Sequence, residues 1–296
     1  MDWFYGCHLS SHDIFESINE VNNYGGNLIQ IFVSNPIGKP SNNTLIKYTN
    51  LAPQIKKYCI DHLTKIVIHS PYTLNFAKNF DENSYWIQNF IIELKIAHEI
   101  NAIGCVIHVG KSINLDINHA SNNMFISFKY IISIIKKFKL NSIIILETPA
   151  GQGSELLVSD INSIDELANF YHRFSIDDKK YIKICVDTCH IFSAGFDISS
   201  KKKARFFFFL FDKIIGLQYL ALIHFNDSKT TFNSHIDRHE QIGKGNIKLS
   251  GLIEFLKQTF KYKIPLILET HGNAYKKEIP WIRKIISLSL IKKNIT

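Results

Sequence analysis

Eight short apolar runs, spaced so that a helix fits between successive runs, constrain the fold of this 296-residue chain more than any other feature. Most are unbroken rows of apolar residues, the pattern of parallel strands that are covered on both faces. Helical patterns separate them, for example over residues 160–174, where Asp160 is expected to cap the helix. The apolar runs are residues 3–8, 27–34, 65–70, 104–110, 142–148, 183–188, 220–227 and 264–270.

Eight alternating strands and helices predict an α/β fold, a single (β/α)8 TIM barrel, which commonly needs about 250 residues. No linker or change in composition divides the chain, so we expect one domain over residues 1–296. A doubly wound open sheet is the alternative architecture. It is disfavoured because no G-x-G-x-x-G turn follows the first run.

Composition narrows the classes of protein. The apolar stretch "ARFFFFLF" (204–211) is far shorter than the roughly 20 residues of a membrane-spanning helix. The N-terminus lacks the pattern of a signal peptide, so we expect a soluble intracellular protein of the cytoplasm, or of a nucleus or virion. The five cysteines are expected to be reduced thiols and not metal ligands. A net charge of +8 favours a nucleic-acid partner, although an AT-biased genome also produces Lys-rich chains.

Six consecutive apolar runs end in a histidine or a carboxylate, and three similar residues follow two of them. In a barrel these strand ends open on one face, where active sites are built. Crowded carboxylates repel one another unless cations hold them, and mixed imidazole and carboxylate ligands suit zinc or manganese. Nine ligands fit three ions. They are His69, His108, Glu147, Asp187, His190, His224, Asp237, His239 and Glu269.

A three-metal site indicates a substrate that develops several negative charges, above all a phosphodiester. The leading interpretation is therefore metal-dependent hydrolysis of a nucleic-acid backbone. A sugar isomerase or epimerase with one or two divalent ions would use Glu147, Asp187, His224 and Glu269, but leaves the other five residues unexplained. A damaged-DNA or RNA-binding module without activity would show gaps in the ligand set.

Four segments closely resemble the endonuclease IV family of apurinic/apyrimidinic (AP) endonucleases. They are "LETPAGQGS" (146–154), "CVDTCHIFSAGFD" (185–197), "HFNDSKTTFNSHIDRHEQIGKGNI" (224–247) and "IPLILET" (264–270), and the resemblance runs from near residue 6 to about residue 282. It implies a TIM barrel with three Zn²⁺ ions, or Mn²⁺ at one position. It also implies cleavage of duplex DNA 5′ to abasic sites in base excision repair, leaving a 3′-hydroxyl and a 5′-deoxyribose phosphate. Trimming of blocked 3′ ends is expected as well.

Carried over position by position, the resemblance implies how the nine residues divide among the ions. Glu147 bridges the first two ions, and a hydroxide between them attacks phosphorus, so Glu147 and Glu269 are the expected catalytic carboxylates. The ligands, ion by ion, are His69, His108 and Glu147; then Glu147, Asp187, His224 and Glu269; then His190, Asp237 and His239.

DNA contacts are where the chain departs from the family. Tyr72 matches the aromatic wedge beside the abasic site, but Ile37 and Gly38 in the segment 34–43 stand where the family has an Arg/Gln-bearing loop. His8 is a candidate pocket contact, and Asn226 and Asp227 are expected to orient His224. The expected partner is double-stranded DNA with abasic or 3′-blocked damage, bound by a monomer away from membranes.

Overall fold

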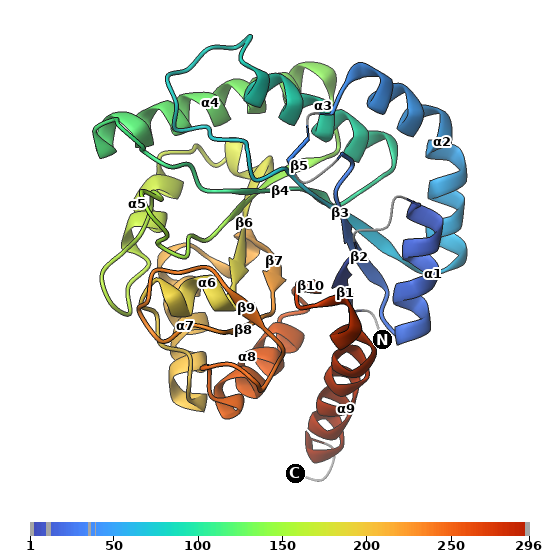
Figure 1. The fold of residues 1–296 in the computed structure, drawn as a ribbon, viewed down its shortest axis with the longest axis vertical. Coiled ribbons are helices and arrows are strands. Elements are labelled where there is room, and N and C mark those ends of the chain that lie inside the picture. Colours follow the sequence, from blue (N-terminus) through green and yellow to red (C-terminus); the bar gives the residue numbers. More distant parts are fainter. Residues whose placement is uncertain (1–2, 10–12, 35–36, 39, 294–296) are drawn as a thin grey trace.

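Eight parallel strands close into a barrel in the computed structural model, which describes residues 3–9, 13–34, 37–38 and 40–293 (Figure 1). The strand order is β1-β10-β7-β6-β5-β4-β3-β2, so each strand pairs with its neighbours in sequence and β10 closes the barrel against β1. The (β/α)8 prediction is confirmed. The barrel strands are β1 (Tyr5–His8), β2 (Leu28–Ile31), β3 (Lys65–His69), β4 (Gly104–His108), β5 (Ile143–Glu147), β6 (Ile182–Asp187), β7 (Leu220–His224) and β10 (Leu266–Leu268).

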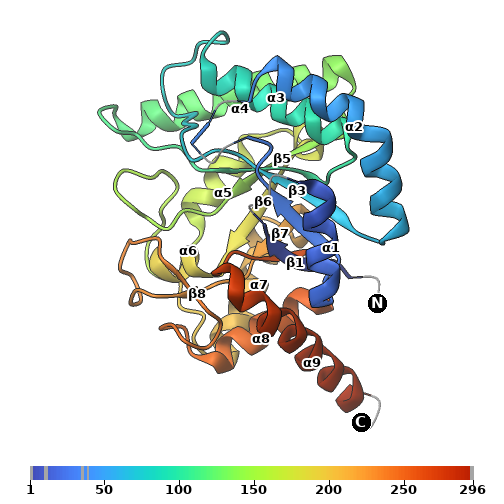
Figure 2. The same cartoon turned by 45° about the vertical axis from the view of Figure 1, so that its right-hand side comes forward.

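Helices form a ring outside the strands (Figure 1). They are α1 (Ile14–Tyr24), α2 (Asn42–Asp61), α3 (Tyr85–Glu99), α4 (Ile117–Phe138), α5 (Asp165–His172), α7 (Lys201–Ile214), α8 (Leu249–Lys261) and α9 (Tyr275–Lys293). The last helix, α9, packs against α1 and α8, and Figure 2 shows its C-terminal end extending beyond the ring. Within the described part of the chain, no helix combines the length and apolarity needed to cross a bilayer.

The expected cap at Asp160 is wrong. The helix α5 begins at Asp165, because the preceding residues form a turn in which Ser163 N donates to Asp160 O and Asn162 is left-handed (φ 58°). Serine hydroxyl groups cap the first turn of α5 instead. Ser163 Oγ accepts from Asp165 N, and Ser159 Oγ accepts from Glu166 N.

An apolar layer fills the barrel interior and determines which side chains reach the mouth. Because strand side chains alternate between two faces, the residue two positions after each layer member also points inward. The interior layer consists of Leu28, Val67, Val106, Ile145, Cys185, Leu222 and Ile267. The residues two positions later, towards the C-terminal mouth, are Gln30, His69, His108, Glu147, Asp187, His224 and Glu269.

A short helix and a pair of two-residue strands complete the mouth. The helix α6 (Thr188–Ser193) starts directly after β6, with Asp187 Oδ1 accepting from His190 N at 2.9 Å. The strands β8 (Asp227–Ser228) and β9 (His239–Glu240) pair antiparallel, with Ser228 opposite His239. This pairing folds the segment after β7 back over the barrel end.

Candidate metal centre

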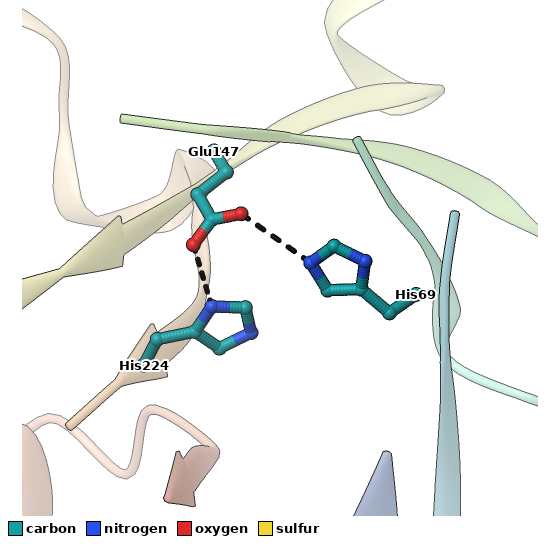
Figure 3. Close-up of side chains that lie close together, drawn as sticks. All are labelled: His69, Glu147 and His224. Atoms are coloured by element: carbon teal, nitrogen blue, oxygen red, sulfur yellow. Dashed lines mark hydrogen bonds and ion pairs between the residues drawn. The ribbon is translucent and has the colours of Figure 1, made fainter. Parts of the chain in front are cut away.

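The carboxylate of Glu147 faces His69 with one oxygen and His224 with the other (Figure 3). Its Oε1 is 2.7 Å from His224 Nδ1, while its Oε2 lies 3.5 Å from His69 Nε2 and 3.4 Å from His108 Nε2. The β4–β5 register sets His108 directly beside Glu147. One buried carboxylate therefore faces imidazoles on two sides, the geometry required of a bridging ligand.

A second group surrounds His224. One ligand atom from each of Glu147, Asp187, His224 and Glu269 lies within 4.8 Å of the others. His224 Nδ1 is 3.1 Å from Glu269 Oε2 and 4.0 Å from Asp187 Oδ2. Three carboxylates thus converge on one ring nitrogen.

A third group forms where the β8–β9 segment covers the mouth. Asp237 Oδ1 lies 3.2 Å from His190 Nε2 and 3.4 Å from His239 Nε2. The β5 loop fixes this group, because Gln152 Oε1 accepts from Asp237 N at 3.0 Å. The structure therefore brings all nine predicted ligands together, in three overlapping groups.

The charges of the site are balanced by buried imidazoles. Burial raises the pKa of Glu147, but the imidazoles of His108 and His224 outweigh burial and hold this pKa well below its ordinary value. Burial lowers the pKa of His224, but Cys185, Glu269 and Glu147 together raise it well above the usual range. Asp187 nevertheless keeps a raised pKa, from burial and from the carboxylates beside it. The buried histidines therefore offset the negative charge of Glu147, whereas their effect on Asp187 is outweighed.

Unpartnered atoms test whether metal ions fit. Among the described residues, ten buried side-chain atoms have no hydrogen-bond partner, and four of the ten belong to predicted ligands and face the centre. They are Glu147 Oε2, His108 Nε2, His190 Nε2 and His239 Nε2. Buried polar atoms are normally satisfied, so these orphaned lone pairs indicate a missing ligand. Their mixed nitrogen and oxygen set suits zinc.

A pocket of about 210 Å³ opens onto the three groups. Tyr72 stands at its edge, 61% exposed, with its ring centroid 5.8 Å from that of His69 and 5.5 Å from that of His108. His8 lies inside the pocket, 3.3 Å from Glu269 Oε1 through its Nδ1.

Sequence reasoning missed two residues of the site. Phe32 follows β2, and its ring lies 4.5 Å from that of His8 and 5.8 Å from that of Tyr72. Gln30, on β2, is fully buried among the candidate ligands. An amide side chain in the middle of the apolar run "NLIQIFVS" was the available signal.

The expected roles of Asn226 and Asp227 are wrong. Asn226 Nδ2 donates to Asp187 Oδ2 at 2.6 Å and its Oδ1 accepts from Glu269 N at 2.8 Å, so it orients those two ligands rather than His224. Asp227 turns away from the site and accepts backbone N–H groups of the following loop. Asn226 lies between β7 and β8, whereas Asp227 begins β8 and binds the loop that follows, so only one of the pair reaches the mouth.

Two other segments bear on the site. Asn35, Pro36 and Lys39 of the 34–43 loop lie outside the described residues, while the side chain of Ile37 is 73% exposed. Cys189 lies within 4.8 Å of the ligand atoms of Asp237 and His239. Burial raises the pKa of its thiol to about 12, so a proton normally occupies the sulfur.

Comparisons with known proteins point in one direction. The family model described as a xylose isomerase-like TIM barrel matches residues 18–285. The "Probable endonuclease 4" of Clostridium beijerinckii is 32% identical over 294 residues, covering 95% of this chain and 98% of that protein. The "Putative endonuclease 4" of Acanthamoeba polyphaga mimivirus is 34% identical over 288 residues, covering 92% and 87%.

Solved structures show how widely the fold is shared. Endonuclease IV from Thermus thermophilus superposes with a TM-score of 0.68 at 20% identity, covering 98% of this chain and 99% of the other. A D-tagatose 3-epimerase-like protein superposes equally well, with a TM-score of 0.68 at 17% identity and coverage of 98% and 100%. The fold alone therefore does not separate the two kinds of protein, whereas the sequence relatives do.

Proposed function

Because the chain belongs to the endonuclease IV family of xylose isomerase-like TIM barrels, we propose that it is a zinc-dependent AP endonuclease. It hydrolyses the phosphodiester 5′ to an abasic site in duplex DNA, leaving a 3′-hydroxyl and a 5′-deoxyribose phosphate. The convergence of nine ligands carries the proposal. A sugar epimerase needs only the group around His224, and would leave His108, His190 and His239 with orphaned buried nitrogens.

The proposed centre holds three Zn²⁺ ions, with Mn²⁺ as an alternative at one of them. The three sets of ligands are His69, His108 and Glu147; Glu147, Asp187, His224 and Glu269; and His190, Asp237 and His239. Bound zinc supplies Lewis acidity, lowers the pKa of water and neutralises the charge of the reacting phosphate. The same chemistry would remove phosphate groups that block 3′ ends, because they also present a phosphoester at the end of a strand.

The protein's own residues place the substrate. A backbone phosphate reaches a centre inside a barrel mouth only when the damaged nucleotide leaves the base stack, and a missing base makes this extrusion less costly. Tyr72 stands exposed at the pocket edge, where its ring can stack in the vacated space. The net charge of +8 attracts the DNA backbone.

Oligomeric state and domain organisation follow from the same site. One chain supplies all nine ligands, so the proposed centre needs no second copy of the protein. We therefore propose a monomer with one catalytic domain over residues 1–296.

Incision of a defined duplex tests the function. Zinc-loaded protein should cut a labelled duplex at its single abasic site and leave the matched undamaged duplex intact. The new 3′ end should support primer extension without further processing. Elemental analysis should give close to three zinc ions per chain. One or two manganese or magnesium ions, together with interconversion of ketoses, would instead establish the epimerase alternative.

Glu269→Gln tests the catalytic carboxylate. The amide is nearly isosteric but weakens the metal and removes a negative charge, so incision should fall by at least a hundredfold while binding of the abasic duplex stays within about threefold. Glu254→Gln is the matched control, because the Glu254 side chain is only 5% exposed, against 12% for Glu269, but pairs with Arg205 on the helical ring. Glu269→Gln activity within threefold of that control would remove Glu269 from the proposed centre.

A further inference from the structure

Gln30 is a neutral side chain enclosed by charged ones. It lies on the inner face of β2 with no solvent exposure, in the same layer as the candidate metal ligands. Its Oε1 lies 2.9 Å from His224 Nε2, and its Nε2 lies 2.7 Å from Glu269 Oε1 and 3.0 Å from His8 Nδ1. One amide thus contacts two candidate ligands of the same group.

Chemistry fixes which way the amide points. Glu269 Oε1 can only accept, so the NH₂ group of Gln30 must face it and the amide oxygen must face His224. That oxygen accepts a hydrogen bond, and the His224 ring must therefore carry a proton on Nε2. The opposite tautomer would set two acceptors against each other at 2.9 Å, which is unfavourable in a buried site.

The consequence for His224 concerns which nitrogen is available. With Nε2 protonated and bound to Gln30, the other nitrogen, Nδ1, faces Glu147 at 2.7 Å and Glu269 Oε2 at 3.1 Å. The carboxylate of Glu269 is divided in the same way. Its Oε1 is held by Gln30, and its Oε2 points to the group around His224.

We propose that Gln30 is a positioning residue of the metal centre, which binds the outer atom of both His224 and Glu269 so that Nδ1 and Oε2 face the ion. The inference rests on the metal centre of the proposed function, and it does not depend on the nature of the substrate. Partners of this kind fix ring orientation and tautomer, and their loss typically reduces metal affinity or activity by about 10–100-fold.

Two substitutions on one strand separate positioning from packing. Gln30→Met keeps the length of the side chain but removes both hydrogen bonds. Leu28→Met is the matched control, because Leu28 is also fully buried and points into the barrel two residues earlier on β2. The same new side chain therefore enters the same interior, with and without loss of contact to the ligands.

Three measurements are made on the zinc-loaded proteins. Long-range ¹H–¹⁵N correlation of the histidine rings should show His224 of the wild type protonated at Nε2. Competition with a chelator should show that Gln30→Met binds one of its zinc ions with about 10–100-fold lower affinity than wild type. Incision of the abasic duplex by this variant should have a kcat reduced at least tenfold and a KM within about twofold of wild type. Leu28→Met should keep zinc affinity, kcat and KM within about twofold of wild type.

Several results would overturn the inference. A wild-type His224 protonated at Nδ1 would do so even if Gln30→Met failed to fold. Zinc affinity and kcat equal in the two methionine variants would do so as well. If wild-type protein binds zinc with the expected tautomer but leaves abasic DNA uncut, the proposed substrate is wrong and the role of Gln30 stands.

Discussion

Among single residues, Glu93 is a fully buried carboxyl group that the proposed chemistry does not use. It lies on α3 with no solvent exposure, and Ser70 Oγ donates to its Oε2 at 2.5 Å, while its Oε1 has no partner among the described residues. Burial raises the pKa of this carboxyl to about 8, despite the opposing hydrogen bond from Ser70. At neutral pH the folded protein therefore keeps Glu93 protonated. Its hydrogen-bond partner Ser70 directly follows the candidate ligand His69 in the chain.

This protonation makes stability depend on pH. The unfolded chain ionises Glu93 near its ordinary value of 4.5, whereas the folded chain ionises it near 8. Stability is therefore greatest below the lower value and falls as pH rises towards 8. The glutamine side chain of Glu93→Gln does not titrate. Between about pH 5 and 8 the free energy of unfolding of this variant should therefore rise relative to that of wild type by a few kcal/mol, at about 1.4 kcal/mol per pKa unit. Urea unfolding of both proteins across this range, with Glu254→Gln as control, measures the difference. A constant difference would mean that folded Glu93 is ionised.

A second single residue, Tyr72, provides the test of substrate recognition. Stacking against a base contributes about 1–3 kcal/mol. Tyr72→Ala should therefore weaken binding of an abasic duplex about tenfold while leaving zinc content unchanged. Ile37→Ala should have a smaller effect, because Ile37 has no long polar side chain to insert. Titration of a labelled duplex at fixed salt compares them. Equal affinities of wild type and Tyr72→Ala would show that Tyr72 does not stack beside the abasic site. A larger loss of affinity in Ile37→Ala would assign this role to the 34–43 loop.

Among the elements, the segment from β8 to α8 depends on one carboxylate. Asp227 accepts hydrogen bonds from the backbone N–H groups of Ser228, Gly243, Gly245 and Ile247, at 2.8–3.0 Å. Gly245 approaches so closely that an added Cβ would lie 2.4 Å from Asp227 Oδ1. Because β8 pairs with β9, this carboxylate also sets the strand that presents His239.

Asp227→Asn should therefore affect the third group of ligands first. The amide NH₂ would face N–H donors, so unfolding free energy should fall by about 2–4 kcal/mol. Zinc content after gentle dialysis should fall from near three towards two ions per chain, because Asp237 and His239 lie on the loosened segment. Asp197→Asn, at another loop carboxylate that accepts from Ser199 N, is the control and should keep its zinc. Full zinc content in Asp227→Asn would separate the loop from the metal centre.

The strands and the segments that follow them also show how much of the site could be predicted from the sequence. Ligands at strand ends were predictable because strand side chains alternate between two faces, so the residue two positions after the last inward apolar side chain lies at the mouth, as for Ile145 and Glu147. The contacts of Asn226, Asp227 and Gln30 were not. They depend on which face a residue takes at the exact end of a strand and on groups some twenty to two hundred positions away. Local pattern contains neither.

For the whole molecule, metal and fold should be thermodynamically linked. The nine ligands come from elements around the full barrel, and an unfolded chain cannot hold them together, so zinc should bind the folded state and stabilise it. Prolonged chelation should lower Tm by at least about 5 °C, and zinc should restore it, whereas magnesium should not. Differential scanning calorimetry of the stripped and reloaded protein measures this. An unchanged Tm would show that the centre forms no part of the stability of the barrel.

The closing of the barrel by β10 has a consequence for biosynthesis. β10 pairs with β1 on one side and β7 on the other, and Glu269 follows it directly. A nascent chain on the ribosome therefore exposes His69 and His108 long before the strand that completes their surroundings has been made. The full set of ligands can come together only after the last barrel strand has left the exit tunnel, so the proposed centre is completed late in biosynthesis.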